Sequence, residues 1–205
     1  ATHINVPADI SSAAFFIVAA LITKNSSIVL KDVGINPTRS GILDALIAMG
    51  ADIQIKNERM FNDEPVADLH VASSELKNIE IKGDIIPRLI DEIPILALAA
   101  TQAEGTMVIK NAEELKVKET NRIDAVATQL NRLGANIEPT DDGMIIHGKT
   151  KLKGETVDSL GDHRIGMMLA VASLVCENEI TIENESCISI SYPNFFEDFQ
   201  KLINE

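Results

Sequence analysis

The sequence is poor in aromatic residues, cysteine and basic charge. Its 205 residues include no Trp and a single Tyr, so a buried core must be built from aliphatic side chains. Acidic residues outnumber basic ones by 31 to 18, which gives a formal net charge of −13 at pH 7. Because nucleic acids and anionic membranes attract a basic surface, this balance argues against both as partners. An anionic substrate would need basic side chains that are concentrated locally.

The sequence also lacks the patterns of metal sites and membrane segments. The two cysteines, Cys176 and Cys187, lie in apolar surroundings without a histidine at metal-ligand spacing, so we expect two buried thiols in a reducing cytoplasm. The longest apolar runs, at 13–22 and 165–176, are shorter than a membrane span. No basic segment precedes either run, so no signal peptide is predicted. The 45% hydrophobic content is that of a soluble globular protein, which we expect in the cytoplasm.

An internal repeat organises the chain. Each unit of roughly 75 residues has a short strand and an Asp before an apolar helix, then a second strand, a basic loop and a second helix. The units span about 1–75, 76–150 and 151–205, and a hairpin closes the first two. Gly50-Ala51-Asp52 and Gly134-Ala135-Asn136 recur where the second helix ends, a position that favours glycine. The expected helices lie at 12–22, after Arg39 up to Met49, and at 90–103, 122–133, 163–176 and 193–203. The expected strands lie at 4–6, 27–30, 53–55, 79–81, 106–110, 156–157 and 179–183, with a hairpin turn at 141–143.

This order predicts an α/β (α+β) domain of threefold-repeated β-α-β-α-β-β units with buried helices and outer sheets. The stretches 13–22, 93–100 and 165–175 are apolar nearly all round, as buried helices are. A pseudo-threefold axis would gather their N-termini at one end, after Asp9, Asp84 and Asp162. Partial positive charge collects at helix N-termini, so the sequence predicts an anion-binding end.

The segment 118–122, with the sequence KETNR, is the first candidate for chemistry. Lys118 and Arg122 are four residues apart and Glu119 is three before Arg122, so a helical turn would project all three to one side. Two cations around a carboxylate can bind an anion and keep an acid or base beside it. The alternative is a solvated helix start with an ordinary Glu–Arg pair.

Two further groups precede the buried helices. His163 and Arg164 follow Asp162, and Arg can grip a carboxylate or phosphate through two parallel hydrogen bonds. The alternative is a charge cluster at a solvated helix end. Asp91 begins the helix of the second unit, where it is either an ordinary N-cap or, by its position in the repeat, part of the anion-binding end. The remaining histidines lie in or beside alternating strands and are expected at the surface: His3, His70 and His147.

These motifs resemble a known family. KETNR at 118–122, DHR at 162–164, PADISSAA at 7–14 and IDEIP at 90–94 are similar to the signature of the 5-enolpyruvylshikimate-3-phosphate synthases, within the enolpyruvyl transferases. The resemblance runs from about residue 3 to 203 and covers the later half of the family's length. It implies that residues 1–205 form the C-terminal domain of an inside-out α/β barrel architecture. The N-terminal domain, which closes on the substrates, would then be its partner outside this sequence.

The resemblance implies an enzyme of the shikimate pathway. The family transfers the enolpyruvyl group of phosphoenolpyruvate to the 5-hydroxyl of shikimate 3-phosphate and releases phosphate, through a tetrahedral intermediate and without a metal or organic cofactor. We expect residues 1–205 alone to be inactive. Two alternatives remain: a UDP-N-acetylglucosamine enolpyruvyl transferase, against which KETNR and DHR argue, and a stand-alone anion-binding module.

The resemblance also assigns roles by position. Asp91 corresponds to the carboxylate that accepts the proton of the shikimate hydroxyl, and Glu119 to the acid/base that protonates the methylene of phosphoenolpyruvate. The substrate-binding positions are Lys118 near the hydroxyls, Arg122 and Arg164 on phosphoenolpyruvate, and the site-lining His163. Three positions depart from the family: Ile190 stands where many relatives have a lysine, Asn121 where many have Asp, and Ala8 where Gly is common.

Overall fold

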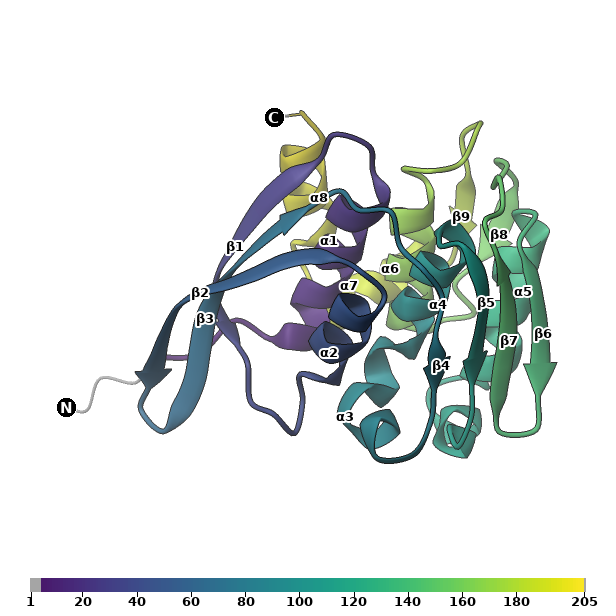
Figure 1. Cartoon of the computed structure of the whole chain (residues 1–205). Coiled ribbons are helices and arrows are strands. Elements are labelled where there is room, and N and C mark those ends of the chain that lie inside the picture. Colours follow the sequence, from purple (N-terminus) through teal and green to yellow (C-terminus); the bar gives the residue numbers. More distant parts are fainter. Residues whose placement is uncertain (1–4, 205) are drawn as a thin grey trace.

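Three apolar helices form the centre of the molecule: α1 (Ile10–Ile22), α4 (Ile93–Gln102) and α6 (His163–Ala172). In the computed structural model, which describes residues 5–204, each of the three packs against the other two. All ten residues of α4 except Gln102 are buried, and so are most residues of α1 and α6. The predicted internal packing of the three helices is therefore confirmed, and Figure 1 shows them between the outer sheets.

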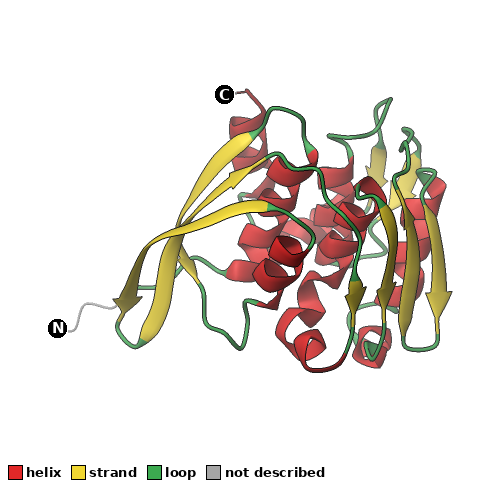
Figure 2. Cartoon of the chain, viewed as in Figure 1, coloured by secondary structure: helices red, strands yellow, loops and turns green. Residues whose placement is uncertain are grey.

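The sheets follow the repeat and lie outside the helices, as Figure 2 shows. In the first unit, β1 (Ser27–Gly34), β3 (Glu64–Ala72) and β2 (Asp52–Phe61) form an antiparallel sheet in that spatial order. The second unit has four strands in the order β4 (Glu80–Ile81), β5 (Gly105–Ile109), β7 (Gly143–Gly148) and β6 (Asn136–Thr140). The third pairs β8 (Thr156–Asp158) with β9 (Thr181–Glu183) in parallel. The described part of the third unit thus has no closing hairpin, in line with the sequence pattern.

Further helices complete each unit. The second helices of the first two units are α2 (Gly41–Ala48) and α5 (Arg122–Arg132), and α8 (Phe195–Asn204) ends the described chain. Gly50 and Gly134 follow α2 and α5 with φ of +94° and +96°, which confirms their predicted role as helix terminators. The remaining short helical segments are η1 (Gly83–Ile85), α3 (Ile86–Leu89), η2 (Ile90–Glu92), η3 (Glu113–Val117), η4 (Glu185–Cys187) and α7 (Ile188–Ser191).

Several predicted boundaries are wrong. The first strand is not formed: residues 5–7 are irregular, and only Ala8 pairs, through an isolated bridge to Val33, while Ile4 and His3 lie outside the described residues. The helix predicted at 90–103 begins at Ile93, after the 3-10 turn η2. The helix predicted to reach residue 176 ends at Ala172, because Cys176 is drawn into a bridge with Leu152.

All of the scarce aromatic residues except Phe61 of β2 gather in one place. Phe195 and Phe199 of α8 stack with ring centroids 5.5 Å apart, and Phe16 of α1 lies 5.7 Å from Phe195. Tyr192 meets Phe16 edge-on at 6.0 Å. This cluster packs α8 against the central helices, so aromatic side chains cover one side of the aliphatic core.

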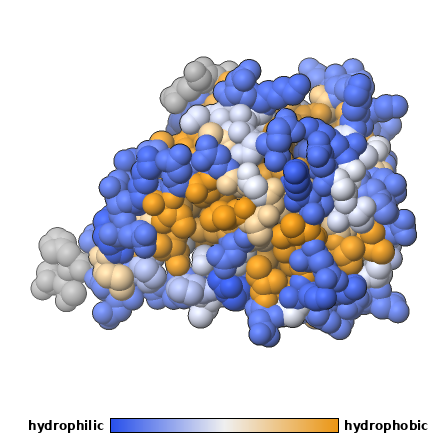
Figure 3. Space-filling view, in the orientation of Figure 1, coloured by the Kyte–Doolittle hydropathy of each residue, from blue (hydrophilic) through white to orange (hydrophobic). Residues whose placement is uncertain are grey.

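Surface features match the predictions in part. Of the two cysteines, Cys187 is buried and Cys176 is half-buried, and both are free thiols. His70 and His147 are partly exposed. None of the helices within residues 5–204 is long and apolar enough to cross a membrane. In Figure 3 apolar side chains gather over α2 and α3 in the middle of the face shown, where Ile47 is 44% exposed.

Candidate functional site

The guanidinium of Arg122 lies at the centre of the site. Asn121 caps α5 by accepting a hydrogen bond from the backbone N of Asp124, and Arg122 is the first residue of the helix. The Arg122 side chain is 1% exposed. Its Nε donates to Asp162 Oδ2 at 2.8 Å and its Nη2 to Asp162 Oδ1 at 3.3 Å, and the carboxylate of Asp162 is fully buried. A buried charge pair of this kind needs good geometry to offset desolvation, which the double contact supplies.

The same guanidinium holds both carboxylates that were predicted to be catalytic. Its Nη1 donates to Asp91 Oδ1 at 3.1 Å and its Nη2 to Glu119 Oε2 at 2.5 Å. Asp91 is about one-third exposed and Glu119 about half exposed, so both face the solvent side of a buried cation. Arg122 therefore holds two carboxylates in fixed positions through one rigid, planar guanidinium.

Two further cations flank Asp91 less tightly. Lys118 Nζ lies 3.5 Å from Asp91 Oδ1, and Arg164 Nη2 lies 3.6 Å from Asp91 Oδ2. Lys118 also donates to Glu114 at 2.6 Å. Since the contacts of Lys118 and Arg164 with Asp91 are longer than a good hydrogen bond, these cations keep donors for an incoming anion.

His163 completes the cluster beside Glu119. Its Nδ1 lies 3.9 Å from Glu119 Oε1, and the side chain is 17% exposed. Burial and the neighbouring charge of Arg164 lower the pKa of His163 below its usual value, and together they outweigh Asp162 and Glu119. The imidazole is therefore poised to stay neutral at physiological pH.

The charges of the cluster also lower the pKa values of two of its carboxylates. Burial alone would raise the pKa of Asp91, but the charges of Arg164, Lys118 and Arg122 outweigh it and hold that pKa below the usual value. Burial likewise opposes ionisation of Asp162, and the Arg122 contact overcomes it to lower the pKa of Asp162. Both carboxylates are therefore ionised at neutral pH.

All six predicted site residues thus come together, but the helical turn considered for 118–122 and the N-cap alternative for Asp91 are wrong. Lys118 and Glu119 do not lie in a helical turn with Arg122: Lys118 has an extended backbone with ψ of −160°, and α5 begins only at Arg122. The side chains converge because the chain folds back before the helix. Asp91 is not a helix cap either, since it lies in η2 and its side chain contacts cations instead.

Sequence reasoning missed the roles of two buried acids. Asp162 belongs to a predicted motif but has no predicted partner, although it is the principal partner of Arg122 and also accepts from Thr120 Oγ1 at 3.2 Å. Glu92, rather than Asp84 or Asp91, is the residue at the N-cap position of α4. Their positions directly before a buried helix were the available signal, because the ends of such helices are the places where charge reaches the interior.

The N-termini of the central helices gather the acids and cations of the site. Asp9 caps α1 by accepting from Ser12 N at 2.9 Å, and Asp162 caps α6 by accepting from Arg164 N at 2.9 Å. The end of the helices that was predicted to bind anions thus carries the predicted basic residues, and anion binding there stays a prediction. Among residues 5–204, no group of three or more His, Cys, Asp or Glu side chains is arranged to hold a metal ion.

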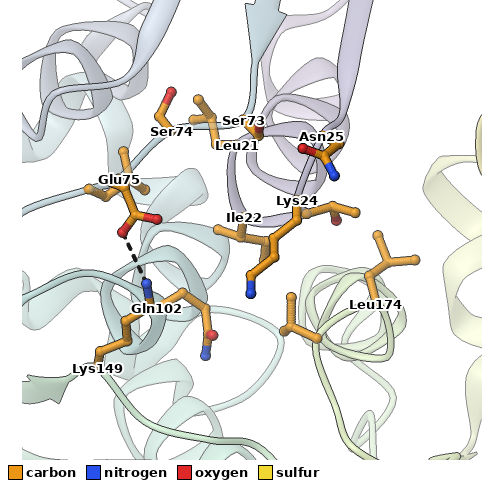
Figure 4. Close-up of a pocket in the computed structure, with 13 residues that line it drawn as sticks. Leu21, Ile22, Lys24, Asn25, Ser73, Ser74, Glu75, Gln102, Lys149 and Leu174 are labelled. Atoms are coloured by element: carbon orange, nitrogen blue, oxygen red, sulfur yellow. Dashed lines mark hydrogen bonds and ion pairs between the residues drawn. The ribbon is translucent and has the colours of Figure 1, made fainter.

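A hollow lies at the opposite end of the helices. It measures about 610 Å³ and is formed where α1 and α4 end and where the chain turns after α6. Figure 4 shows Lys24 and Gln102 pointing into it and the ion pair between Glu75 and Lys149, 3.1 Å apart, on its wall. None of the six predicted site residues lines this hollow.

Comparison with known proteins gives the family of the chain. The family described as EPSP synthase (3-phosphoshikimate 1-carboxyvinyltransferase) matches residues 1–199. The chain is 60% identical over 202 residues to a 3-phosphoshikimate 1-carboxyvinyltransferase of Bacillus cereus, covering 98% of this chain and 47% of that protein. It is 61% identical over 204 residues to that of Geobacillus kaustophilus, with 98% and 48% covered.

A solved structure agrees as well. The EPSP synthase from Acinetobacter baumannii superposes with a TM-score of 0.94 at 44% identity, over 97% of this chain and 46% of that one. The chain therefore spans about half the length of the relatives it matches. Sequence and fold together show that the chain belongs to the EPSP synthase (3-phosphoshikimate 1-carboxyvinyltransferase) family.

Proposed function

We propose that residues 1–205 form the C-terminal domain of an enzyme that transfers the enolpyruvyl group of phosphoenolpyruvate to the 5-hydroxyl of shikimate 3-phosphate. The observation that carries this proposal is the buried guanidinium of Arg122, which holds Asp91 and Glu119 beside the further cations Lys118 and Arg164. The reaction joins two anionic substrates by acid-base chemistry, so it needs positioned carboxylates together with cations.

In the proposed reaction, Asp91 takes the proton of the 5-hydroxyl of shikimate 3-phosphate. The oxygen of that hydroxyl adds at the same time to the carbon of phosphoenolpyruvate that bears the phosphate. Glu119 gives a proton to the methylene carbon, which becomes a methyl group in the tetrahedral intermediate. Glu119 then takes a proton back from that methyl group as the bond to phosphate breaks. The lowered pKa of Asp91 keeps it ionised and able to accept a proton at neutral pH.

The predicted contact of Arg122 with phosphoenolpyruvate stays a prediction. Three of its nitrogens already donate to carboxylates, and its side chain is 1% exposed. The more accessible Arg164 and Lys118, at 15% and 21% exposure, and the neutral imidazole of His163 are better placed to receive substrate anions. In this proposal the main role of Arg122 is to orient Asp91 and Glu119.

A second domain would complete the enzyme. The relatives are about twice as long as this chain, and the site lies at one end of the helices with Asp91 and Glu119 facing solvent. We infer that the N-terminal half of the enzyme closes over this end and supplies the remaining substrate contacts. The cytoplasmic location expected from the sequence stays a prediction.

The test uses a protein in which this chain follows the N-terminal half of the Bacillus cereus relative. We expect phosphate release from phosphoenolpyruvate with shikimate 3-phosphate as acceptor. Glu119→Gln should lower kcat by at least ~100-fold, the usual range for an acid-base group. Glu113→Gln, an exposed acid on the preceding turn, is the matched control and should leave kcat unchanged. Near-normal turnover in the Glu119 variant would remove its assigned role.

The alternatives give different results in the same assay. Turnover with UDP-N-acetylglucosamine in place of shikimate 3-phosphate would show the related transferase. Residues 1–205 alone should give no turnover and bind phosphoenolpyruvate weakly. Sub-micromolar binding by the chain alone in calorimetry, without turnover by the joined protein, would instead identify a stand-alone anion-binding module.

A further inference from the structure

Glu92 is a buried acid that the proposed reaction does not use. It is 2% exposed and occupies the N-cap position of α4, next to Asp91. The corresponding acids Asp9 and Asp162 accept backbone hydrogen bonds from their own helices, whereas the Glu92 side chain makes no such bond. Capping therefore does not explain why a carboxylate is buried at this position, where an unpaired charge is costly.

The contacts of Glu92 lead to two other repeat units. Ser11 of α1 donates its hydroxyl to Glu92 Oε1 in a short hydrogen bond. Arg39 Nη2 donates to the same Ser11 hydroxyl at 3.0 Å, and Arg39 also lies 3.7 Å from Asp9. On the other side, Arg164 Nη1 lies 4.0 Å from Glu92 Oε1. The carboxylate thus connects Arg39 of the first unit with Arg164 of the third.

Arg164 consequently lies between two neighbouring acids. Its Nη2 is 3.6 Å from Asp91 and its Nη1 is 4.0 Å from Glu92, so the two ends of one guanidinium face consecutive carboxylates. Asp91 is shared with Lys118 and Arg122, while Glu92 has no other cation within 4.0 Å among the described residues. Burial raises the pKa of Glu92, whereas Ser11 and the charge of Arg164 favour its ionised form.

We propose that Glu92 is a positioning residue that holds Arg164 in one orientation over the site, anchored through Ser11 to α1. This inference rests on the proposed function, in which Arg164 receives an anionic group of phosphoenolpyruvate. With Glu92 in place, the Nη1 end of the Arg164 guanidinium faces Glu92 and does not pair with Asp91. Asp91 therefore remains available to accept a proton. Without Glu92, the guanidinium turns toward Asp91 and pairs with it.

The effect on catalysis follows from that geometry. Misplacing a binding group by about 1 Å can cost on the order of 100-fold in rate, so a partial turn of Arg164 should cost about tenfold. In the joined protein, Glu92→Gln, which keeps the shape and removes the charge, should lower kcat/KM for phosphoenolpyruvate about tenfold. The KM for shikimate 3-phosphate should stay within about twofold, because Arg164 is assigned to the other substrate.

A double-mutant cycle distinguishes positioning from a structural role. If Glu92 acts through Arg164, Glu92→Gln should change kcat/KM by less than about twofold in an Arg164→Lys background. Asp68→Asn is the matched control: Asp68 is also a buried acid, held by Arg59 on the outer sheet, so its variant loses stability without changing kcat/KM. Additive losses in the cycle, or an equal rise of KM for both substrates, would overturn the proposal.

A crystal structure of the Glu92→Gln chain gives a measurement independent of turnover. We expect the Arg164 guanidinium to move toward Asp91 and to leave the position facing residue 92; an unmoved guanidinium would overturn the proposal. If Glu92→Gln does not fold, Ser11→Ala removes the anchor, together with its contact to Arg39, and keeps the charge of Glu92. The same movement and a smaller loss of kcat/KM are then expected. An inactive joined protein with natural Glu92 would count against the proposed function, while the movement of Arg164 would still decide this inference.

Discussion

At the scale of single residues, the sequence predicted which side chains lie together but not how they pair. Asp91, Glu119 and Arg122 were chosen from motifs and from their place in the repeat, and all three meet. The burial of Arg122 could not be predicted. It depends on Asp162, which lies forty residues later in the sequence and reaches the same point from the start of another helix. Local spacing carries no information on such a long-range pair.

The pair between Arg122 and Asp162 leads to a prediction about stability. Arg122→Ala leaves the fully buried Asp162 carboxylate without its cation, and breaking a buried pair in this way costs about 3–5 kcal/mol of unfolding free energy. Urea unfolding of the chain followed by circular dichroism measures the loss. Arg132→Ala, at the exposed end of the same helix, should stay within about 0.5 kcal/mol of the natural chain.

A third variant checks the cause of that loss. Arg122→Met combined with Asp162→Asn removes both charges and keeps a capping side chain at the start of α6. It should be more stable than Arg122→Ala, since neutral groups replace an uncompensated charge. Equal losses in Arg122→Ala and Arg132→Ala would show that the pair contributes little.

At the scale of elements, helices were easier to predict than their first turns. The apolar stretches of α1, α4 and α6 and the glycines after α2 and α5 stand out in the sequence, because burial and left-handed φ restrict residue type. The helical turn considered for 118–122 is not formed before Arg122, because side-chain spacing alone cannot distinguish a helical turn from a loop that folds back. The true start of α5 is set by its cap, Asn121.

The cap of α5 can be tested directly. Asn121 Oδ1 accepts from the backbone N of Asp124, so Asn121→Ala should lower the unfolding free energy by about 1 kcal/mol. Asn121→Ser keeps a capping oxygen and should stay within about 0.5 kcal/mol of the natural chain, measured by thermal or urea unfolding. The Asn121 amide also donates to the Asp124 carboxylate at 2.6 Å. Equal losses in both variants would assign the stability to this side-chain contact and contradict the capping role.

At the scale of the whole molecule, the threefold repeat made the architecture predictable. Three units in the same order implied central helices, outer sheets and one charged end, and each of these is present. The prediction of the first strand was wrong, because Asn5 and Val6 have the alternation of a strand but form no backbone ladder with another strand. Pairing depends on what lies beside a segment, which only the folded chain determines.

The same charged end should make global stability depend on pH. His163 has a lowered pKa, so the unfolded chain binds its proton more readily than the folded chain, and stability is lost as pH falls below the usual histidine value. Asp91 and Asp162, whose pKa values are also lowered, add a further loss as pH falls below the usual aspartate value. Glu92 has a raised pKa and acts in the opposite sense, since its contribution to stability is lost as pH rises through that pKa.

Urea midpoints at about pH 7 and about pH 5.5 separate these contributions, because only histidine has its ordinary pKa in that interval. The natural chain should have a lower midpoint at the lower pH, and His163→Gln should remove most of the difference. His147→Gln, at a 38% exposed position on the outer sheet, is the control and should leave the difference unchanged. If His163→Gln and the natural chain lose the same amount, His163 is not the group that links protonation to folding.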